Sequence, residues 1–116
     1  MAKSTNLRVW HQARELLKLI SAVTADMRAE GDLISQMRRA AISIASNIAE
    51  GAERSDRDGC RLFTIALGSN AEVETQIIIA GDLGLIDDAT VATIVDRTDH
   101  IGKMIRKLIQ YRQASG

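Results

Sequence analysis

The sequence predicts an all-α protein: a single domain of residues 1–116 folded as an antiparallel, up-down-up-down four-helix bundle. The chain has no proline, and its residues are 46% hydrophobic but only 3% aromatic, so Ala, Leu and Ile must supply most of the packing. Apolar residues recur every three or four positions through four long segments, as they do on the buried face of an amphipathic helix. No segment alternates apolar and polar residues in the way a half-buried strand does.

The first helix is predicted over residues 7–28, where an apolar stripe repeats with heptad-like spacing. The stripe consists of Val9, Ala13, Leu16, Ile20, Val23 and Met27. Gly31 can take the left-handed conformation that closes a helix, and Asp32 can cap the helix that follows.

The second helix is predicted over residues 33–53 and carries a polar stripe beside its apolar one. The apolar residues are Ile34, Met37, Ala41, Ile44 and Ile48, and the polar ones are Arg39, Ser43, Ser46 or Asn47, Glu50 and Arg54. A polar group that is buried without a partner costs about 1 to 3 kcal/mol, so these side chains need partners. We expect this helix to be packed on several sides, with its polar residues facing other helices or another subunit.

The third helix is predicted over residues 56–83, and it ends at Gly84. Ser55 and Asp58 resemble a capping box at its start, with Asp in place of Glu. Near its end Ile77, Ile78 and Ile79 are consecutive, so apolar side chains cover nearly the whole circumference. This helix is therefore either central or in contact with another chain, and together with the two-sided second helix it predicts self-association.

The fourth helix is predicted over residues 88–112 and begins at Asp87 or Asp88, since acidic residues favour a helix N-terminus. Its core stripe consists of Val91, Ile94, Thr98, Ile101, Ile105 and Leu108. Every predicted connection is short, which favours antiparallel neighbours along the chain.

Small and polar residues inside the helices indicate where the helices approach one another. Gly51, Gly68 and Ser69 favour close helix crossings over backbone exposed for a ligand. Asn47 and Glu50 are a candidate buried hydrogen-bonding pair that would fix the helix register. Their candidate ionic partners are Arg38 or Arg39 and Glu72 or Glu74.

The charges balance, with 15 basic and 15 acidic residues, so the chain is not a general binder of polyanions. Local basic sets remain, and a ring of subunits would repeat and sum them into a surface able to bind RNA. The candidate residues for contact with RNA or another partner are Arg8, Arg14, Lys18, Lys103, Arg106, Lys107 and Arg112. Tyr111 is the one candidate for stacking on bases, and as isolated patches these charges are typical of a solvated surface.

The sequence predicts no catalytic, cofactor-binding or metal-binding residue. The histidines are His11 and His100; His11 with Glu15 could form half a metal site, but a solvated ion pair is the commoner arrangement. Cys60 is alone, which favours a reducing compartment, and no stretch approaches the length of a membrane span or a signal peptide. We therefore expect a cytoplasmic protein without a membrane partner and without enzymatic activity.

Three segments resemble a known family: LRVWHQARELLKLI, SQMRRAAISIASNIAEGAER and FTIALGSNAEVETQ. They resemble a family of bacterial four-helix-bundle proteins, which includes proteins encoded within intervening sequences of 23S ribosomal RNA. A related branch contains the accessory variability determinant of diversity-generating retroelements. The similarity covers roughly residues 7–86, and the last helix agrees by pattern only.

The resemblance implies a protomer that assembles into a ring of five copies. In the retroelement branch the ring is a basic barrel that binds RNA and a reverse transcriptase. The resemblance implies mainly structural roles, within the bundle and between protomers, for the residues that match the family motif. These are Arg38, Arg39, Ser43, Asn47, Ile48, Glu50, Gly51, Arg54, Ala66, Gly68, Ser69 and Glu72. The chain departs from the family at Ala45, where proline is usual, and at Asn70, where leucine is usual.

These observations predict a homo-oligomeric scaffold, with five copies favoured, that contacts structured RNA or an RNA-handling protein. The alternative is a protein–protein interaction module with no nucleic-acid role, which would use a polar groove at a subunit junction.

Overall fold

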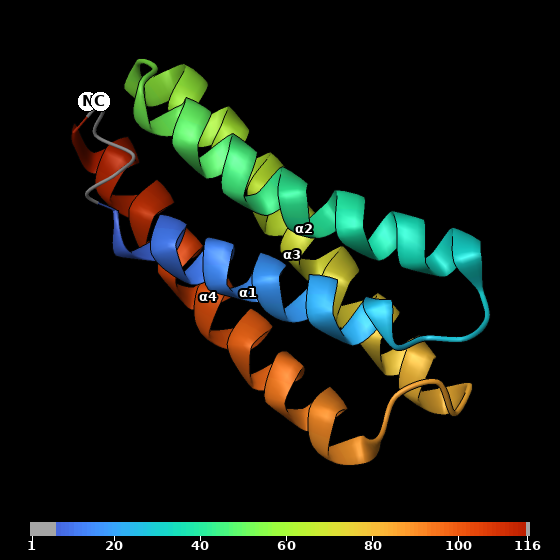
Figure 1. Cartoon of the computed structure of the whole chain (residues 1–116). Coiled ribbons are helices and arrows are strands. Elements are labelled where there is room, and N and C mark those ends of the chain that lie inside the picture. The colour runs from blue at the N-terminus through green and yellow to red at the C-terminus, as the bar shows by residue number, and fades with distance from the viewer. Residues whose placement is uncertain (1–6, 116) are drawn as a thin grey trace.

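The computed structural model describes residues 7–115, and in this part of the chain all regular structure is α-helical (Figure 1). The helices are α1 (Arg8–Ala25), α2 (Gly31–Ala52), α3 (Asp56–Asp82) and α4 (Asp88–Ser115). The predicted all-α class is confirmed. Residues 1–6 and 116 of the predicted domain lie outside the described residues.

Each helix runs antiparallel to the one before it, and the four close a square around one core (Figure 1). Neighbouring helices pack in the pairs α1–α2, α2–α3, α3–α4 and α1–α4, so α1 lies diagonally opposite α3. The bundle measures 46 × 22 × 20 Å. The start of α1, the turn from α2 to α3 and the end of α4 lie at the same end of the bundle (Figure 1).

The predicted apolar stripes form most of this core. The largest fully buried side chains are Phe63, Leu16, Ile20, Met37, Ile44, Ile48, Ile77, Ile94, Ile101, Ile105, Val73 and Thr24. The predicted stripe of α1 includes Val23, but Val23 is only half-buried, and its neighbour Thr24 is buried instead. The side of α1 that carries Thr24 faces α2. There Thr24 Oγ1 accepts a hydrogen bond of 2.8 Å from Arg38 Nε and donates one of 2.7 Å to the carbonyl oxygen of Ile20.

The helix ends follow the sequence at Ser55, Gly84 and Asp87 and differ between α1 and α2, where Asp32 lies inside α2 and does not cap it. Ser55 Oγ accepts the N–H of Asp58 at 3.3 Å, so the predicted cap of α3 is confirmed. Gly84 has a φ of 74° and closes α3 with Leu85, whose N–H bonds the carbonyl of Ala80 at 2.9 Å. Between α1 and α2 the left-handed residue is Glu30, with a φ of 67°, so the expectation that Gly31 takes this conformation is wrong.

Asp87 caps α4, as the sequence predicts. Its Oδ1 accepts the backbone N–H of Thr90 at 2.7 Å. Hydrogen bonds from the side chain and backbone of Thr90 lower the pKa of Asp87 below its ordinary range. The ionised carboxylate therefore occupies the positive end of the helix dipole.

Candidate interaction surfaces

The outer side of α2 and α3 brings together most of the residues that the sequence marked as structural or inter-protomer. We call this surface the α2/α3 face. From α2 and the turn after it come Gln36, Arg39, Ser43, Asn47, Glu50 and Arg54, and from α3 and its C-cap come Ile65, Gly68, Ser69, Glu72, Ile79 and Leu83. A hollow of about 420 Å³ at its centre is lined by Gln36, Arg39, Ala40, Ser43, Ser69 and Glu72.

Small polar side chains hold α2 and α3 together beneath this hollow. The hydroxyl oxygens of Ser43 and Ser69 lie 2.8 Å apart and share a hydrogen bond. Asn47 Nδ2 donates to the carbonyl oxygen of Ser43 at 2.9 Å and to its Oγ at 3.0 Å. The close crossing predicted at Ser69 is therefore confirmed, with Ser43 as its partner on α2.

The predicted pair of Asn47 and Glu50 does not form, so this prediction is wrong. Asn47 bonds one turn back to Ser43, while Glu50 points outward and pairs with Arg54 at 2.7 Å, each side chain being about half exposed. Each residue thus takes a partner four positions away along the chain: Asn47 bonds back within α2, and Glu50 in the last turn of α2 reaches Arg54 in the turn that follows.

The candidate ionic partners also bond elsewhere within the chain. Arg38 turns toward α1 and Thr24, and Glu74 turns toward α4, where its Oε1 accepts the hydroxyl of Thr98 at 2.7 Å. Arg39 donates to Ser35 Oγ at 3.2 Å, and Glu72 Oε2 accepts the Nε2 of Gln76 at 3.2 Å. In the described part of the chain no ion pair joins either arginine to either glutamate.

Three large aliphatic side chains stand exposed on the α2/α3 face. Ile65 is 44% exposed, Ile79 42% and Leu83 56%. Ile65 and Ile79 each lie seven residues from Glu72, so these two isoleucines lie on the same side of α3 as Glu72. Ile78 is also exposed, at 43%, but it lies about 100° further round the helix and outside this face. The consecutive isoleucines thus divide between the core, where Ile77 is fully buried, and two different outer sides.

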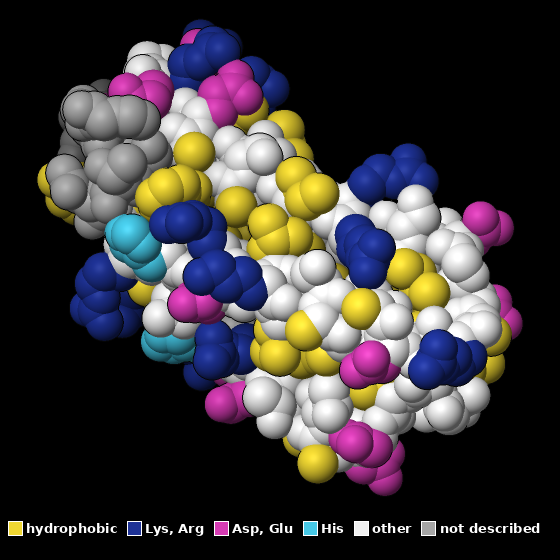
Figure 2. Space-filling model, in the orientation of Figure 1, with side chains coloured by type: hydrophobic (Ala, Val, Ile, Leu, Met, Phe, Trp, Pro, Cys, Tyr) yellow, Lys and Arg dark blue, Asp and Glu magenta, His cyan; other side chains and the backbone are white. Residues whose placement is uncertain are grey.

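The predicted basic residues of α1 and α4 gather on another surface, which we call the α1/α4 face. Figure 2 shows Lys, Arg and His side chains concentrated where the first half of α1 lies beside the second half of α4. Exposed residues in these segments are Arg8, His11, Arg14, Lys18, His100, Lys103, Arg106 and Lys107. A shallow hollow of about 360 Å³ is lined by His100, Lys103, Met104, Arg106, Lys107 and Gln110.

Some of these charges are already engaged. Lys18 pairs with Glu15 at 3.5 Å and Lys103 with Asp99 at 3.2 Å, and all four side chains are more than half exposed. The Arg14 guanidinium carbon lies 4.7 Å from the centroid of the Trp10 ring. Within residues 7–114, Arg8, Arg106 and Lys107 form no ion pair, so they supply the uncompensated positive charge of this face.

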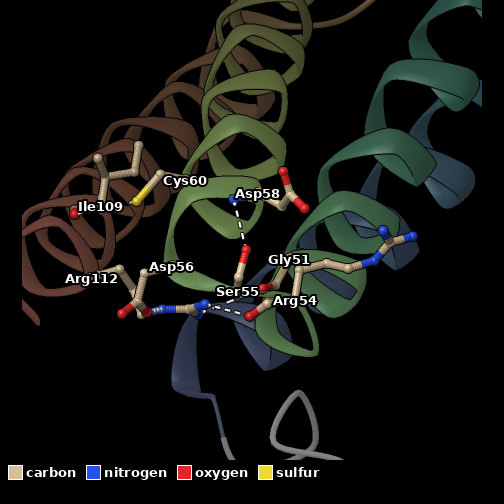
Figure 3. Close-up of polar contacts among 8 residues, drawn as sticks. All are labelled: Gly51, Arg54, Ser55, Asp56, Asp58, Cys60, Ile109 and Arg112. Carbon is tan, nitrogen blue, oxygen red and sulfur yellow. Dashed lines mark hydrogen bonds and ion pairs between the residues drawn. The ribbon is translucent and has the colours of Figure 1, made fainter. Parts of the chain in front are cut away.

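The sequence predicts Arg112 as a contact for RNA or another partner, and in the structure this side chain is engaged inside the protomer (Figure 3). From the end of α4 it reaches the turn between α2 and α3, where its Nε bonds the carboxylate of Asp56. A terminal nitrogen donates to the carbonyl of Arg54 at 2.8 Å. The guanidinium carbon lies 5.4 Å from the centroid of the buried Phe63 ring, and only 14% of the Arg112 side chain is exposed.

The glycines separate into close crossings and open positions. A Cβ at Gly51 would lie 2.6 Å from a ring carbon of Phe63, so the predicted close crossing is confirmed there. A Cβ at Gly59 would lie 2.7 Å from the carbonyl oxygen of Gly51, a partner that sequence reasoning missed. Gly68 has nothing within 4 Å of its Cβ position, so the crossing predicted there does not occur within the protomer.

A Cβ at Gly59 would also lie 2.7 Å from a terminal nitrogen of Arg112. The sequence does not predict the contacts of Gly59 and Arg112, because they depend on how the bundle closes. A glycine on each side of a predicted turn was the available signal, since Gly51 and Gly59 flank Ser55. Nothing in the local sequence of α4 distinguishes Arg112 from the exposed Arg106.

The remaining candidates for chemistry are the histidines and Cys60. Among residues 7–114, no group of three or more His, Cys, Asp and Glu side chains is placed to hold a metal ion. The His11 ring meets the Trp10 ring edge-on at 5.3 Å between centroids, and Cys60 Sγ lies 3.7 Å from the carbonyl oxygen of Ile109. In the same part of the chain, no helix combines the length and the apolar character that crossing a bilayer requires.

Comparison with known proteins links this architecture to one family. The family model described as 23S rRNA-intervening sequence protein matches residues 5–107. Among solved structures, the chain is similar to a protein of unknown function from the S23 ribosomal protein family of Bacteroides thetaiotaomicron VPI-5482. The two share 22% sequence identity with a TM-score of 0.83, over 87% of this chain and 97% of that one. This likeness shows a shared fold. No curated protein matches the chain.

Proposed function

The chain belongs to the family of 23S rRNA-intervening sequence proteins, and from this membership we propose that it is a non-enzymatic, cytoplasmic scaffold. In this proposal the protomers self-associate through the α2/α3 face, and five copies form a ring. The ring then contacts structured RNA, or a protein that handles RNA, through its repeated α1/α4 faces.

The observation that carries the proposal is the exposed aliphatic surface of the α2/α3 face. Ile65, Ile79 and Leu83 lie exposed on one side of α3, and they flank a groove floored by Ser43 and Ser69. Large aliphatic side chains exposed on one side of a helix, beside a polar groove, favour burial of that side against another chain. Gly68, which is open within the protomer, permits a second backbone to approach the same side of α3.

We expect Ile79→Asp to dissociate the assembly, because a carboxylate would be buried without a partner at the subunit contact. Ile78→Asp is the matched control, since this neighbouring residue is equally exposed but points away from the α2/α3 face. Native mass spectrometry and light scattering at about 20 μM would count the copies in each variant. We expect five copies for the wild type and Ile78→Asp, and one for Ile79→Asp.

A wild-type protein that is monomeric at this concentration would contradict self-association. If Ile78→Asp dissociated the copies and Ile79→Asp did not, self-association would stand but the face would be wrongly assigned. Circular dichroism of each variant must show full helix content before its mass is interpreted.

Contact with RNA is supported by the uncompensated charges of the α1/α4 face. Arg8, Arg106 and Lys107 form no ion pair in the described residues, and a ring of five copies repeats them around one assembly. Phosphate contacts of this kind supply affinity that falls with salt, because they release counter-ions. Tyr111 is the exposed aromatic side chain nearest to this set along α4, so contacts to the RNA backbone would dominate over base stacking.

We expect the assembly to bind a structured RNA fragment with an affinity that falls by at least about tenfold between 50 and 200 mM salt. The double variant Arg106→Ala/Lys107→Ala removes two repeated charges and should weaken binding by a further factor of about ten at low salt. Arg28→Ala/Arg57→Ala, which removes two exposed charges elsewhere, should bind like the wild type. Fluorescence anisotropy with a labelled ribosomal RNA hairpin measures all three proteins.

Binding that does not change with salt, or an equal loss in the two double variants, would contradict contact through the α1/α4 face. The alternative function, a module that binds only proteins, would gain support if affinity purification recovered the same partner protein before and after nuclease treatment.

A further inference from the structure

Two opposite charges line the groove of the α2/α3 face without neutralising each other. Arg39 lies on the α2 side of the groove, and Glu72 lies on the α3 side. Within the described residues neither side chain forms an ion pair, although both line the same hollow of about 420 Å³.

Each of these charges is held in place by a neutral group on its own helix. Arg39 donates to the hydroxyl of Ser35 at 3.2 Å, one turn earlier on α2. Glu72 Oε2 accepts the Nε2 of Gln76 at 3.2 Å, one turn later on α3, and Gln76 is itself only 5% exposed. These contacts orient the guanidinium and the carboxylate but leave their charges uncompensated.

The neighbouring charged pair on α2 is already complete. Glu50 and Arg54 bind each other at 2.7 Å, so they offer no counter-ion to the groove. Arg39 and Glu72 are therefore the charges of the groove lining that remain available to a partner.

We propose that Arg39 of one copy pairs with Glu72 of a second copy, and that this ion pair sets the register of the assembly. The inference rests on the proposed self-association, and it identifies the contact that completes the groove. In a ring each copy has a neighbour on either side, so Arg39 pairs with Glu72 of the next copy and Glu72 pairs with Arg39 of the copy before, without any other molecule.

The surroundings of Glu72 favour a strong pair. Ile65 and Ile79 lie about two helical turns before and after it on the same side of α3, so an exposed apolar side chain stands beyond the carboxylate in each direction. When two copies meet, these isoleucines exclude water from the pair, and the lower local dielectric strengthens the attraction. The small Ser43 and Ser69 leave room above the groove floor for an incoming guanidinium.

Charge reversal tests this pair. Arg39→Glu and Glu72→Arg each place like charges at the contact, so each should raise the protomer concentration needed for assembly by at least about tenfold. The double variant Arg39→Glu/Glu72→Arg restores every contact and should assemble within about threefold of the wild-type concentration. Sedimentation equilibrium over a dilution series measures the wild type first and then each variant.

Mixing the two single variants shows whether the pair joins two chains. A copy that carries Arg39→Glu and a copy that carries Glu72→Arg are complementary, so their equimolar mixture should associate at concentrations where each alone is monomeric. A ring with an odd number of copies cannot alternate the two completely, so the readout is regained association and not copy number. Arg97→Glu and Asp96→Arg make the same kinds of charge change at exposed positions of α4 and should assemble like the wild type.

The outcomes separate this pair from the proposed function. If the wild type assembles and both single reversals assemble at the same concentration, the Arg39–Glu72 pair is overturned and self-association remains. If the folded single variants stay monomeric when mixed, the pair is overturned as a contact between chains. A monomeric wild type would overturn self-association itself, and with it the pair.

Discussion

Gly59→Ala is expected to destabilise the protein by about 2 kcal/mol, although alanine is the better helix former by about 1 kcal/mol. The new Cβ would lie 2.7 Å from the carbonyl oxygen of Gly51 and 2.7 Å from a terminal nitrogen of Arg112. The carbonyl belongs to the backbone of α2, so no rotamer change can relieve the contact and the two helices must move apart. Such overpacking costs about 3 kcal/mol, which exceeds the gain in helix propensity.

Urea denaturation followed by circular dichroism measures this loss, at one fixed protomer concentration because assembly adds to apparent stability. Gly31→Ala is the matched control, since nothing lies within 4 Å of its Cβ position and it begins α2. This control should be as stable as the wild type or more stable by up to about 1 kcal/mol. Equal stabilities for the two alanine variants would contradict the close crossing.

The fold could be predicted because the bundle is encoded by local periodicity. An apolar side chain every three or four residues specifies which side of each helix is buried, and short connections specify antiparallel neighbours. Local hydrogen bonds also placed two starts correctly, at Ser55 and Asp87. The region between α1 and α2 was less predictable, because Glu30 and not Gly31 takes the left-handed conformation.

The candidate surfaces could be predicted in composition but not in pairing. The polar stripe of α2 pointed to Arg39, Ser43 and Asn47, and the structure places them together beside α3. Their partners could not be read from the sequence, because hydrogen bonds one turn away along a helix compete with bonds between helices. Asn47 bonds Ser43 on its own helix, for example, and not Glu50.

Two glycines and two arginines have different surroundings in the folded bundle, and their local sequences do not distinguish them. Gly51 faces the ring of Phe63, whereas Gly68 faces open space, although both lie inside helices. Arg106 points outward, whereas Arg112 reaches the turn between α2 and α3. The end of α4 returns to this turn only after all four helices have packed, and no local pattern carries that information.

Arg112→Ala is expected to lower the free energy of unfolding by about 2 to 3 kcal/mol, which is far more than the loss of a surface charge. The substitution leaves the carboxylate of Asp56 without its ion-pair partner, and that side chain is 36% exposed. It also removes the donor to the Arg54 carbonyl, which follows the last turn of α2, and uncovers one side of Phe63. A fully buried pair would cost more, but solvent reaching Asp56 screens part of the loss.

Arg106→Ala is the matched control, because it removes the same side chain from the exposed side of α4 and should change stability by less than about 0.5 kcal/mol. Arg112→Lys keeps the charge but lacks the planar fork that bonds a carboxylate and a carbonyl together, so it should recover only part of the loss. Combining Arg112→Ala with Asp56→Ala should cost less than the sum of the two single changes, since the carboxylate left unpaired by the first is removed by the second. Additive losses would mean that Arg112 acts only through Phe63 and the carbonyl of Arg54. An Arg112→Ala variant as stable as Arg106→Ala would contradict the role of Arg112 in closing this end of the bundle.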